Sequence, residues 1–145
     1  MTLKDTISIN TTPEKIYEWL MHFVENYKAW HPDHIIAKWI IGINFEKGSI
    51  LYAEEYIENK IEKLKFRVIE NIPNKLLKYK VLFPESLVCS GGSFLIEKSN
   101  NQSILTATLS FRLEKVLNSF SKKKIKAFQR HMKEEGENLK KILEK

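Results

Sequence analysis

The stretch "IKAFQRHMKEEGENLKKI", residues 125–142, decides how this chain can fold. Its apolar side chains recur every three or four residues, which is the period of an α-helix that buries one face. The opposite face carries mainly lysine, arginine and glutamate. This pattern predicts one long C-terminal helix, beginning at about Leu117, with a buried apolar stripe. The stripe comprises Ile125, Phe128, Met132, Leu139 and Ile142.

Turn signals divide the preceding chain into short elements. A strand is expected over residues 4–10, followed by a helix that is capped by Thr11 or Thr12 and has Pro13 in its first turn. A second short helical segment extends to about Trp30. Alternating apolar and polar runs, separated by turn residues, then predict six strands. These strands are expected over residues 35–42, 46–57, 60–70, 74–83, 90–99 and 103–113.

The order of these elements predicts an α+β fold in a single domain of residues 1–145. A curved antiparallel sheet of about seven strands cannot bury its concave face alone, so the long helix is expected to cover it. A cavity between the helix and the sheet is the expected binding site. We assign four large apolar residues to the wall of this cavity. They are Trp30, Trp39, Phe128 and Met132.

The composition is that of a globular protein without a membrane span. Of the 145 residues, 43% are hydrophobic and 29% are charged, and no apolar run approaches the roughly 20 residues that cross a bilayer. The N-terminus lacks the apolar segment of a signal peptide. The single cysteine, Cys89, excludes an internal disulfide and is typical of a reducing compartment, so a cytoplasmic location is expected.

The formal net charge of +6 raises the question of an anionic partner. Most lysines are spread along the chain and often alternate with glutamate, which is typical of a solvated surface. No arginine-rich stripe or zinc-finger spacing is present, so no nucleic-acid partner is expected. One tight cluster, Lys122–Lys124, leaves an anionic partner as a third alternative.

Two polar residues accompany the apolar stripe of the C-terminal helix. His131 and Glu135 are four residues apart, so both side chains lie on one face of a helix. One interpretation is a solvated ion pair on a charged surface, which stabilises a helix only slightly. The phase of the stripe includes Glu135, however, and a buried carboxylate needs a partner such as His131 or a metal ion.

Two further pairs of residues could complete a metal site. The segment "AWHPDHII", residues 29–36, supplies His31 and His34, and "SILYAEEYI", residues 49–57, supplies Glu54 and Glu55. Glu55 shares the smaller and more aliphatic face of its strand and is the favoured inward carboxylate, although a bulge would favour Glu54 instead. With the helical pair, these residues make a nitrogen and oxygen ligand set that suits zinc or another first-row divalent metal.

The succession of elements resembles the helix-grip fold of the Bet v 1-like (START, SRPBCC) superfamily over nearly the whole chain. The stretch "YKAWHPDH", residues 27–34, resembles a motif of the zinc-dependent phloretin and diacetylphloroglucinol hydrolases. This resemblance implies that water cleaves a carbon–carbon bond in a small aromatic or acylated ketone. It also implies four zinc ligands, which would be His34 (or His31), Glu55 (or Glu54), His131 and Glu135.

The resemblance covers only the core domain of these longer hydrolases, whose extra segments help to enclose the substrate. Such enzymes use a further histidine, with tyrosine and asparagine groups, to move protons and orient water. The candidates here for the further histidine are His22 and whichever of His31 and His34 is not a ligand, and Tyr27, Tyr52 and Asn26 are candidates for the other groups. The alternative interpretation is a non-enzymatic module that binds a hydrophobic small molecule, such as a lipid or polyketide, in the cavity. The sequence leaves the oligomeric state open.

Overall fold

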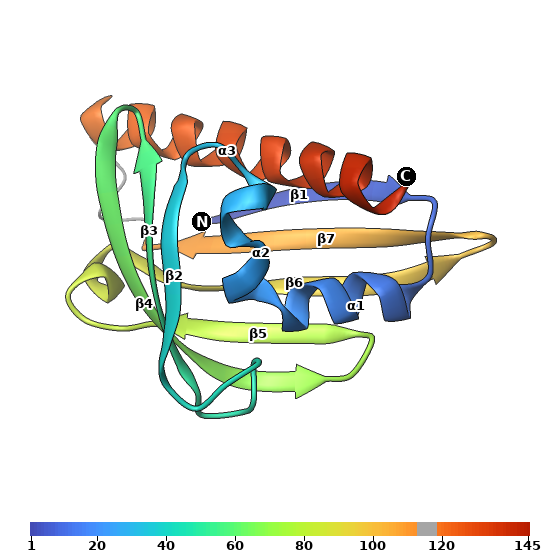
Figure 1. Cartoon of the computed structure of the whole chain (residues 1–145). Coiled ribbons are helices and arrows are strands. Elements are labelled where there is room, and N and C mark those ends of the chain that lie inside the picture. The colour runs from blue at the N-terminus through green and yellow to red at the C-terminus, as the bar shows by residue number, and fades with distance from the viewer. Residues whose placement is uncertain (113–118) are drawn as a thin grey trace.

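The structure of the chain is a computed structural model that describes residues 1–112 and 119–145. Its helices and strands follow the predicted order (Figure 1). A strand comes first, two short helices follow it, and a series of strands leads to a long C-terminal helix. The elements are β1 (Thr2–Ile9), α1 (Pro13–Met21), α2 (Phe23–Trp30), β2 (His34–Ile41), β3 (Ile50–Ile57), β4 (Lys60–Ile72), β5 (Leu76–Val81), the single turn η1 (Glu85–Leu87), β6 (Cys89–Ser99), β7 (Gln102–Phe111) and α3 (Ser119–Leu143).

The strands form one antiparallel sheet of seven strands in the order β1-β7-β6-β5-β4-β3-β2. Strands β2 to β7 pair with their neighbours along the chain, whereas β1 pairs with β7. Register shifts in β2, β4 and β6 mark irregularities of the kind that bend strands. The sheet curves so strongly that β2 and β3 run across the direction of β5 to β7 (Figure 1). The predicted fold class is therefore confirmed.

Helix α3 lies along the sheet with its apolar stripe inward (Figure 1). Met132 and Leu139 are buried, and Ile125, Phe128 and Ile142 are half-buried. Leu139 belongs to one apolar cluster that contains inward residues of the sheet, and Ile125, Phe128 and Met132 belong to a second. The opposite face of the helix remains polar. No helix among the described residues combines the length and the apolar character that a bilayer crossing requires.

The start of the first helix follows the sequence pattern. Thr12, rather than Thr11, is the cap: its hydroxyl oxygen accepts a hydrogen bond from the amide of Lys15 at 3.3 Å. Pro13 occupies the first turn, where its missing N–H is not needed. The predicted end of the last strand at residue 113 and the predicted start of the long helix at Leu117 lie outside the described residues.

Replacing Leu139 by alanine should lower the free energy of unfolding by about 2–5 kcal/mol, because it removes buried methyl groups between α3 and the sheet. Urea denaturation followed by circular dichroism measures this change. Lys141→Ala is the matched control, because Lys141 is exposed on the same helix. An effect of Leu139→Ala no larger than that of the control would contradict the placement of Leu139 in the core.

Candidate functional site

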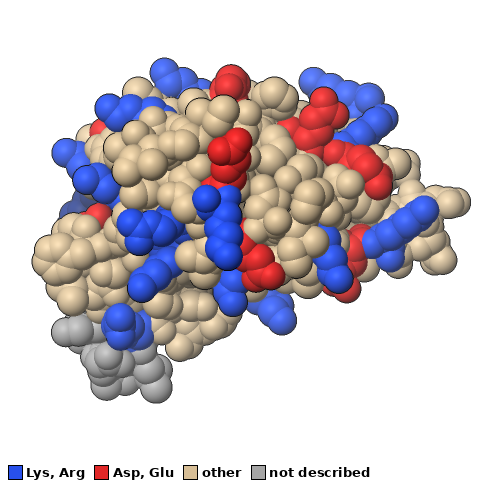
Figure 2. Space-filling model, turned by 90° about the horizontal axis from the view of Figure 1, so that it is seen from below, with Lys and Arg blue, Asp and Glu red and all other residues tan. Residues whose placement is uncertain are grey.

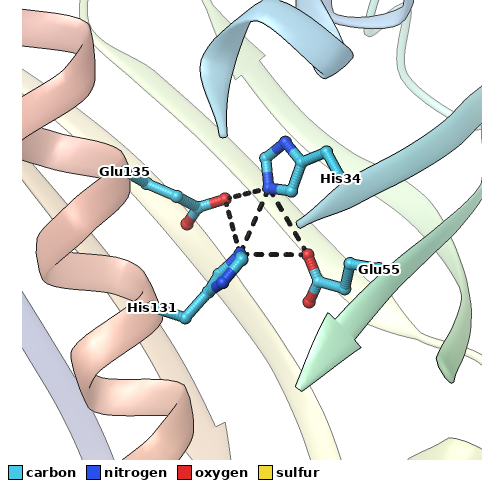
Figure 3. Close-up of side chains that lie close together, drawn as sticks. All are labelled: His34, Glu55, His131 and Glu135. Carbon is cyan, nitrogen blue, oxygen red and sulfur yellow. Dashed lines mark hydrogen bonds and ion pairs between the residues drawn. The ribbon is translucent and has the colours of Figure 1, made fainter. Parts of the chain in front are cut away.

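Four ionisable side chains from three elements meet between α3 and the sheet. His34 begins β2 and Glu55 lies on β3, where the strand register pairs the two residues directly. His131 and Glu135 lie one turn apart on α3. Figure 3 shows the two helix side chains pointing towards the two strand side chains. Tertiary packing thus joins His34 to His131, although 97 positions separate them in the chain.

The nitrogen and oxygen atoms of these side chains lie close enough together that they could hold a metal ion. From Nε2 of His34, the distances are 3.2 Å to Nε2 of His131, 2.8 Å to Oε2 of Glu135 and 3.5 Å to Oε2 of Glu55. From Nε2 of His131, they are 3.2 Å to the same Glu55 oxygen and 3.4 Å to the same Glu135 oxygen. Ligands about 2.0–2.2 Å from a tetrahedral zinc ion lie about 3.3–3.6 Å from one another. Two of the five distances lie in this range and three are shorter, the shortest being the hydrogen bond between His34 and Glu135.

Tyr27 fixes the orientation of His34. Nδ1 of His34 donates a hydrogen bond to the backbone carbonyl of Tyr27 at 2.7 Å, and the two rings stack with their centroids 3.9 Å apart. In the neutral imidazole this bond leaves the lone pair on Nε2, the atom that faces the cluster. The hydroxyl of Tyr27 donates to Oε2 of Glu55 at 3.2 Å. Burial and the nearby Glu55 and Glu135 carboxylates raise the pKa of Tyr27, which keeps this hydroxyl protonated.

His31 is also buried, but both of its ring nitrogens are engaged elsewhere. Its Nδ1 accepts a hydrogen bond from the amide of Asp33 at 2.9 Å, so its Nε2 carries the proton that it donates to Glu134 at 3.0 Å. His31, His131 and Glu134 form a second group that is close enough to hold a cation, although the Glu134 side chain is 48% exposed. The hydrogen bonding favours His34 over His31 as a metal ligand.

Trp30 and Asn138 hold α3 in place beside α2. The indole Nε1 of Trp30 donates to the backbone carbonyl of Glu135 at 3.0 Å, and the amide of Asn138 donates to the backbone carbonyl of Trp30 at 3.0 Å. A shift of α3 by one residue would turn its side chains by about 100°. These bonds therefore maintain the helix position at which His131 and Glu135 face the sheet.

Hydrogen bonds within the cluster set its charge. Burial lowers the pKa of His131, but hydrogen bonds to Glu135 and Glu55 outweigh burial and raise this pKa to about 10. Burial raises the pKa of Glu135, but its hydrogen bonds to His131 and His34 outweigh burial and lower this pKa. The histidine contribution to stability is complete below pH 6.5 and is lost as the pH rises towards about 10. The carboxylate contribution is present above pH 4.5 and is lost on further acidification.

A cavity of about 240 Å³ lies between α3 and the sheet and reaches this cluster. Glu55, His131 and Glu135 form part of its wall, so three of the four clustered side chains can meet a bound molecule. An apolar cavity with polar groups at one place is the usual form of a small-molecule site. The rest of the wall is largely apolar, and its aromatic members include Phe23, Trp30, Phe66, Tyr79, Phe94 and Phe128.

Three of the four residues assigned to the cavity wall from the sequence do line it. These are Trp30, Phe128 and Met132. Trp39 does not line this cavity, because it lies towards the far end of β2 from His34. Its indole packs edge-on against the ring of Phe45, with the centroids 5.2 Å apart.

Most of the candidates for proton transfer lie outside the cluster. Tyr52 lies on the opposite face of β3 and donates its hydroxyl proton to Glu54 at 2.5 Å, so neither residue reaches the cavity. His22 is exposed between α1 and α2, and the amide of Asn26 bonds to a backbone carbonyl of α1. Tyr27 contacts the cluster through Glu55 and His34, and His31, the remaining histidine candidate, lies beside it with its ring centroid 4.2 Å from that of His131. Strand alternation separates Glu54 from the inward face, as the sequence predicts.

The sequence patterns did not single out Phe66, Tyr79 and Phe94 as cavity residues. Their rings form a continuous surface across β4, β5 and β6, with centroid separations of 4.5 Å and 6.3 Å. The alternation of apolar and polar residues shows which side chains of a strand share one face. It does not show which face points into the cavity, and this became clear only from the pairing of each strand with its neighbours.

No protein-family model matches this sequence, and no curated protein matches it significantly. Solved structures do match it over almost its whole length. Major latex-like protein 151 from Panax ginseng matches with a TM-score of 0.76 at 12% identity, with 99% of this chain and 97% of that chain covered. A START superfamily protein from Mycobacterium smegmatis matches with a TM-score of 0.75 at 15% identity, with 99% and 97% covered.

A third match is the di-domain ARO/CYC protein BexL of the BE-7585A biosynthetic pathway. Its TM-score is 0.77 at 10% identity, and the alignment covers 100% of this chain but 50% of that chain. Identities this low establish the fold alone. The chain therefore has the helix-grip fold that Bet v 1-like and START proteins share.

Proposed function

We propose that residues 1–145 form a single helix-grip domain that binds a small hydrophobic molecule in the cavity under α3. The observation that carries this proposal is the cavity wall, which is apolar and aromatic except at one cluster of polar side chains. Burial of apolar ligand surface against such a wall is favourable by roughly 25 cal/mol per Å². This supports ligand binding whether or not a reaction follows.

The polar part of the wall limits the chemistry of the ligand. Glu55, His131 and Glu135 would face one part of any molecule that fills the cavity. A ligand with no polar atoms next to these three side chains would displace the water that bonds to them. The side chains would lose those hydrogen bonds without gaining others, which is unfavourable. We therefore propose an aromatic or cyclic ligand with a ketone or phenol oxygen directed at the cluster.

We further propose that His34, Glu55, His131 and Glu135 hold zinc or another first-row divalent metal ion. Hydrogen bonds alone explain only some of the close contacts in the cluster, because Nε2 of an imidazole carries at most one proton and can donate only that one. Each of these two Nε2 atoms nevertheless has three ligand-type neighbours within 3.5 Å. When bound, such an ion would polarise a carbonyl group or lower the pKa of a water molecule.

A second candidate function is hydrolysis of a carbon–carbon bond in an aromatic ketone. The position of the cluster on the cavity wall favours it, and the resemblance of residues 27–34 to the zinc-dependent hydrolases supplies the reaction class. Water would give its hydroxyl group to the acyl carbon and a proton to the ring carbon, yielding a carboxylic acid and the shortened aromatic compound. Glu55 or Glu135, whichever is not fully engaged as a ligand, would accept the proton from water, and the Tyr27 hydroxyl that bonds to Glu55 could help to return it.

A cytoplasmic location stays a prediction that rests on the single cysteine.

The thiol of Cys89 is expected to be unreactive. Burial raises its pKa to about 11. Because the thiolate is the reactive form, this side chain is expected to be inert, as a small core residue would be.

Wild-type protein should bind N-phenyl-1-naphthylamine, a neutral aromatic probe, with an increase in probe fluorescence. Ala107→Phe should weaken this binding by about tenfold or more, because Ala107 lines the cavity and the new ring would occupy it. Ala29→Phe is the matched control, because it adds the same ring at an exposed position of α2. Equal binding by the two variants would show that the probe binds elsewhere and would contradict the cavity proposal.

Protein purified without a histidine tag should bind zinc, and Glu55→Gln and Glu135→Gln should each weaken the affinity by about tenfold or more, because an amide is a poorer metal ligand than a carboxylate. Competition with a chromophoric chelator measures the affinity. Glu54→Gln and Glu137→Gln are matched controls, because each lies on the same element as a proposed ligand but outside both groups that could hold a cation. Loss of affinity in the controls as large as in the test variants would refute the ligand assignment.

The same zinc titration tests His131. Because its pKa is raised to about 10, zinc must displace a proton from this residue at neutral pH, and zinc affinity should increase with pH. Calorimetry in two buffers of different ionisation enthalpy counts the released protons. Binding without proton release would show that His131 is not a ligand.

The hydrolase hypothesis predicts that zinc-loaded protein releases a carboxylic acid from an acylphloroglucinol, detected by liquid chromatography. Glu135→Gln should abolish this release, and Ala29→Phe should retain it. If the zinc-loaded protein binds the compound and releases no acid, the binding function stands and the hydrolase hypothesis is wrong.

A further inference from the structure

The cavity opens at an end of the molecule that carries exposed apolar side chains. The connection between β5 and β6, which contains η1, presents Phe83, Leu87 and Val88 with exposed fractions of 73%, 53% and 43%. Phe83 is the most exposed large hydrophobic residue in the described part of the chain. Several exposed apolar side chains in one short segment can mark a contact surface.

This connection forms one side of the cavity mouth. Glu85 and Val88 line the cavity from this side, and Glu62 of β4 and Lys124 of α3 line it from the other. Lys124 and Glu62 form an ion pair that joins the first turns of α3 to β4. All four side chains are partly or largely exposed, so the cavity meets the surface between them.

Basic side chains surround the mouth. Nε of Arg112, just after β7, donates to the backbone carbonyl of Ser86 in η1 at 3.0 Å, which places this cation beside the apolar residues. Figure 2 shows the face away from α3, where lysine and arginine are more numerous on the left half, the end at which α3 begins in Figure 1, and most acidic side chains lie at the centre and on the right. Lys63 lines the cavity at the mouth, and Lys122, Lys123 and Lys126 are exposed cations in the first turns of α3, next in sequence to Lys124 and Ile125, which line the cavity.

We propose that this end of the molecule docks on the surface of an anionic lipid bilayer. Apolar side chains at its centre would enter the boundary between headgroups and acyl chains, and the surrounding cations would meet anionic headgroups. Glu62 and Glu85 lie at the same mouth, but Glu62 is paired with Lys124, so positive charge predominates. The docking region, here named the mouth surface, comprises Phe83, Leu87 and Val88 together with Lys63, Arg112, Lys122, Lys123 and Lys126.

A bilayer accounts for the mouth surface better than a nucleic acid does. Phosphates would explain the cations and the ring of Phe83 could stack on a base, but neither accounts for the exposed aliphatic side chains of Leu87 and Val88. A bilayer accounts for both the cations and the apolar centre. It would also place the cavity mouth against a source of apolar molecules. The proposal goes beyond ligand binding and can be tested with no ligand present.

Co-sedimentation with vesicles tests the proposal on the whole protein. Wild-type protein should bind vesicles of phosphatidylcholine and phosphatidylserine in equal parts, and not vesicles of phosphatidylcholine alone. Binding should decrease as salt rises from about 0.1 M to about 0.5 M. The double variant Lys122→Glu, Lys123→Glu should weaken binding by about tenfold or more, because each lysine near an anionic surface contributes about fivefold. Phe83→Ser should weaken it by about tenfold, through loss of a buried ring.

Two controls make the same kinds of change away from the mouth surface. The double variant Lys141→Glu, Lys145→Glu changes the net charge by the same amount as Lys122→Glu, Lys123→Glu. Lys141 lies about 28 Å from Lys122 along the helix. Ile43→Ser removes an apolar side chain that is 56% exposed between β2 and β3. Both should bind vesicles as the wild type does, and circular dichroism should show that all variants fold. Equal losses in the controls, equal binding to neutral vesicles, or no binding to anionic vesicles at about 0.1 M salt would overturn the proposal. So would binding to a DNA oligonucleotide that is tighter than vesicle binding and is lost in the same variants.

Discussion

The packing of α3 along the concave face of the sheet is the constraint on which the rest of this structure depends. The curved sheet turns a row of apolar side chains inward, and these would remain in water without the helix. Met132 and Leu139 of the helix are buried by the same contact. Because its stripe also includes Glu135, with His131 one turn earlier, the same packing brings two ionisable groups inside. Burial of these two groups is favourable only if β2 and β3 supply hydrogen-bonding partners for them.

The partners that the sheet supplies make the cluster more than an isolated ion pair. Removal of a charge from water costs several kcal/mol, and apolar side chains of similar size would pack without that cost. Here two imidazoles and two carboxylates converge, and each Nε2 atom lies close to both carboxylates. Tyr27 and Trp30 add supporting hydrogen bonds from α2. Such support from neighbouring groups is typical of sites that must hold a fixed geometry.

The order of features along α3 connects the cavity to its surroundings. The first turns of the helix carry Lys124 at the mouth, and Ile125 and Phe128 line the cavity beyond it. His131 follows at the polar cluster, and the last turns join the apolar core. A molecule that entered at the mouth would therefore pass an aromatic wall before it met the ionisable groups. One helix thus sets the direction in which a ligand would lie.

Local periodicity in the sequence by itself determined the order of the elements, the inward stripe of α3 and the separation of Glu54 from Glu55. It did so because the periods of 3.6 and two residues depend only on neighbouring positions. The i, i+4 spacing likewise identified His131 and Glu135 as a pair. The sequence did not distinguish His31 from His34 or predict the position of Trp39.

Only the tertiary structure decided these points, because each depends on groups from other elements. Glu134 of α3 engages His31, whereas the carbonyl of Tyr27 orients His34 towards the cluster. The convergence of four side chains needs β2 paired with β3 and α3 docked at one particular position. Contacts between residues about 100 positions apart set that geometry, and no local pattern in the sequence encodes it.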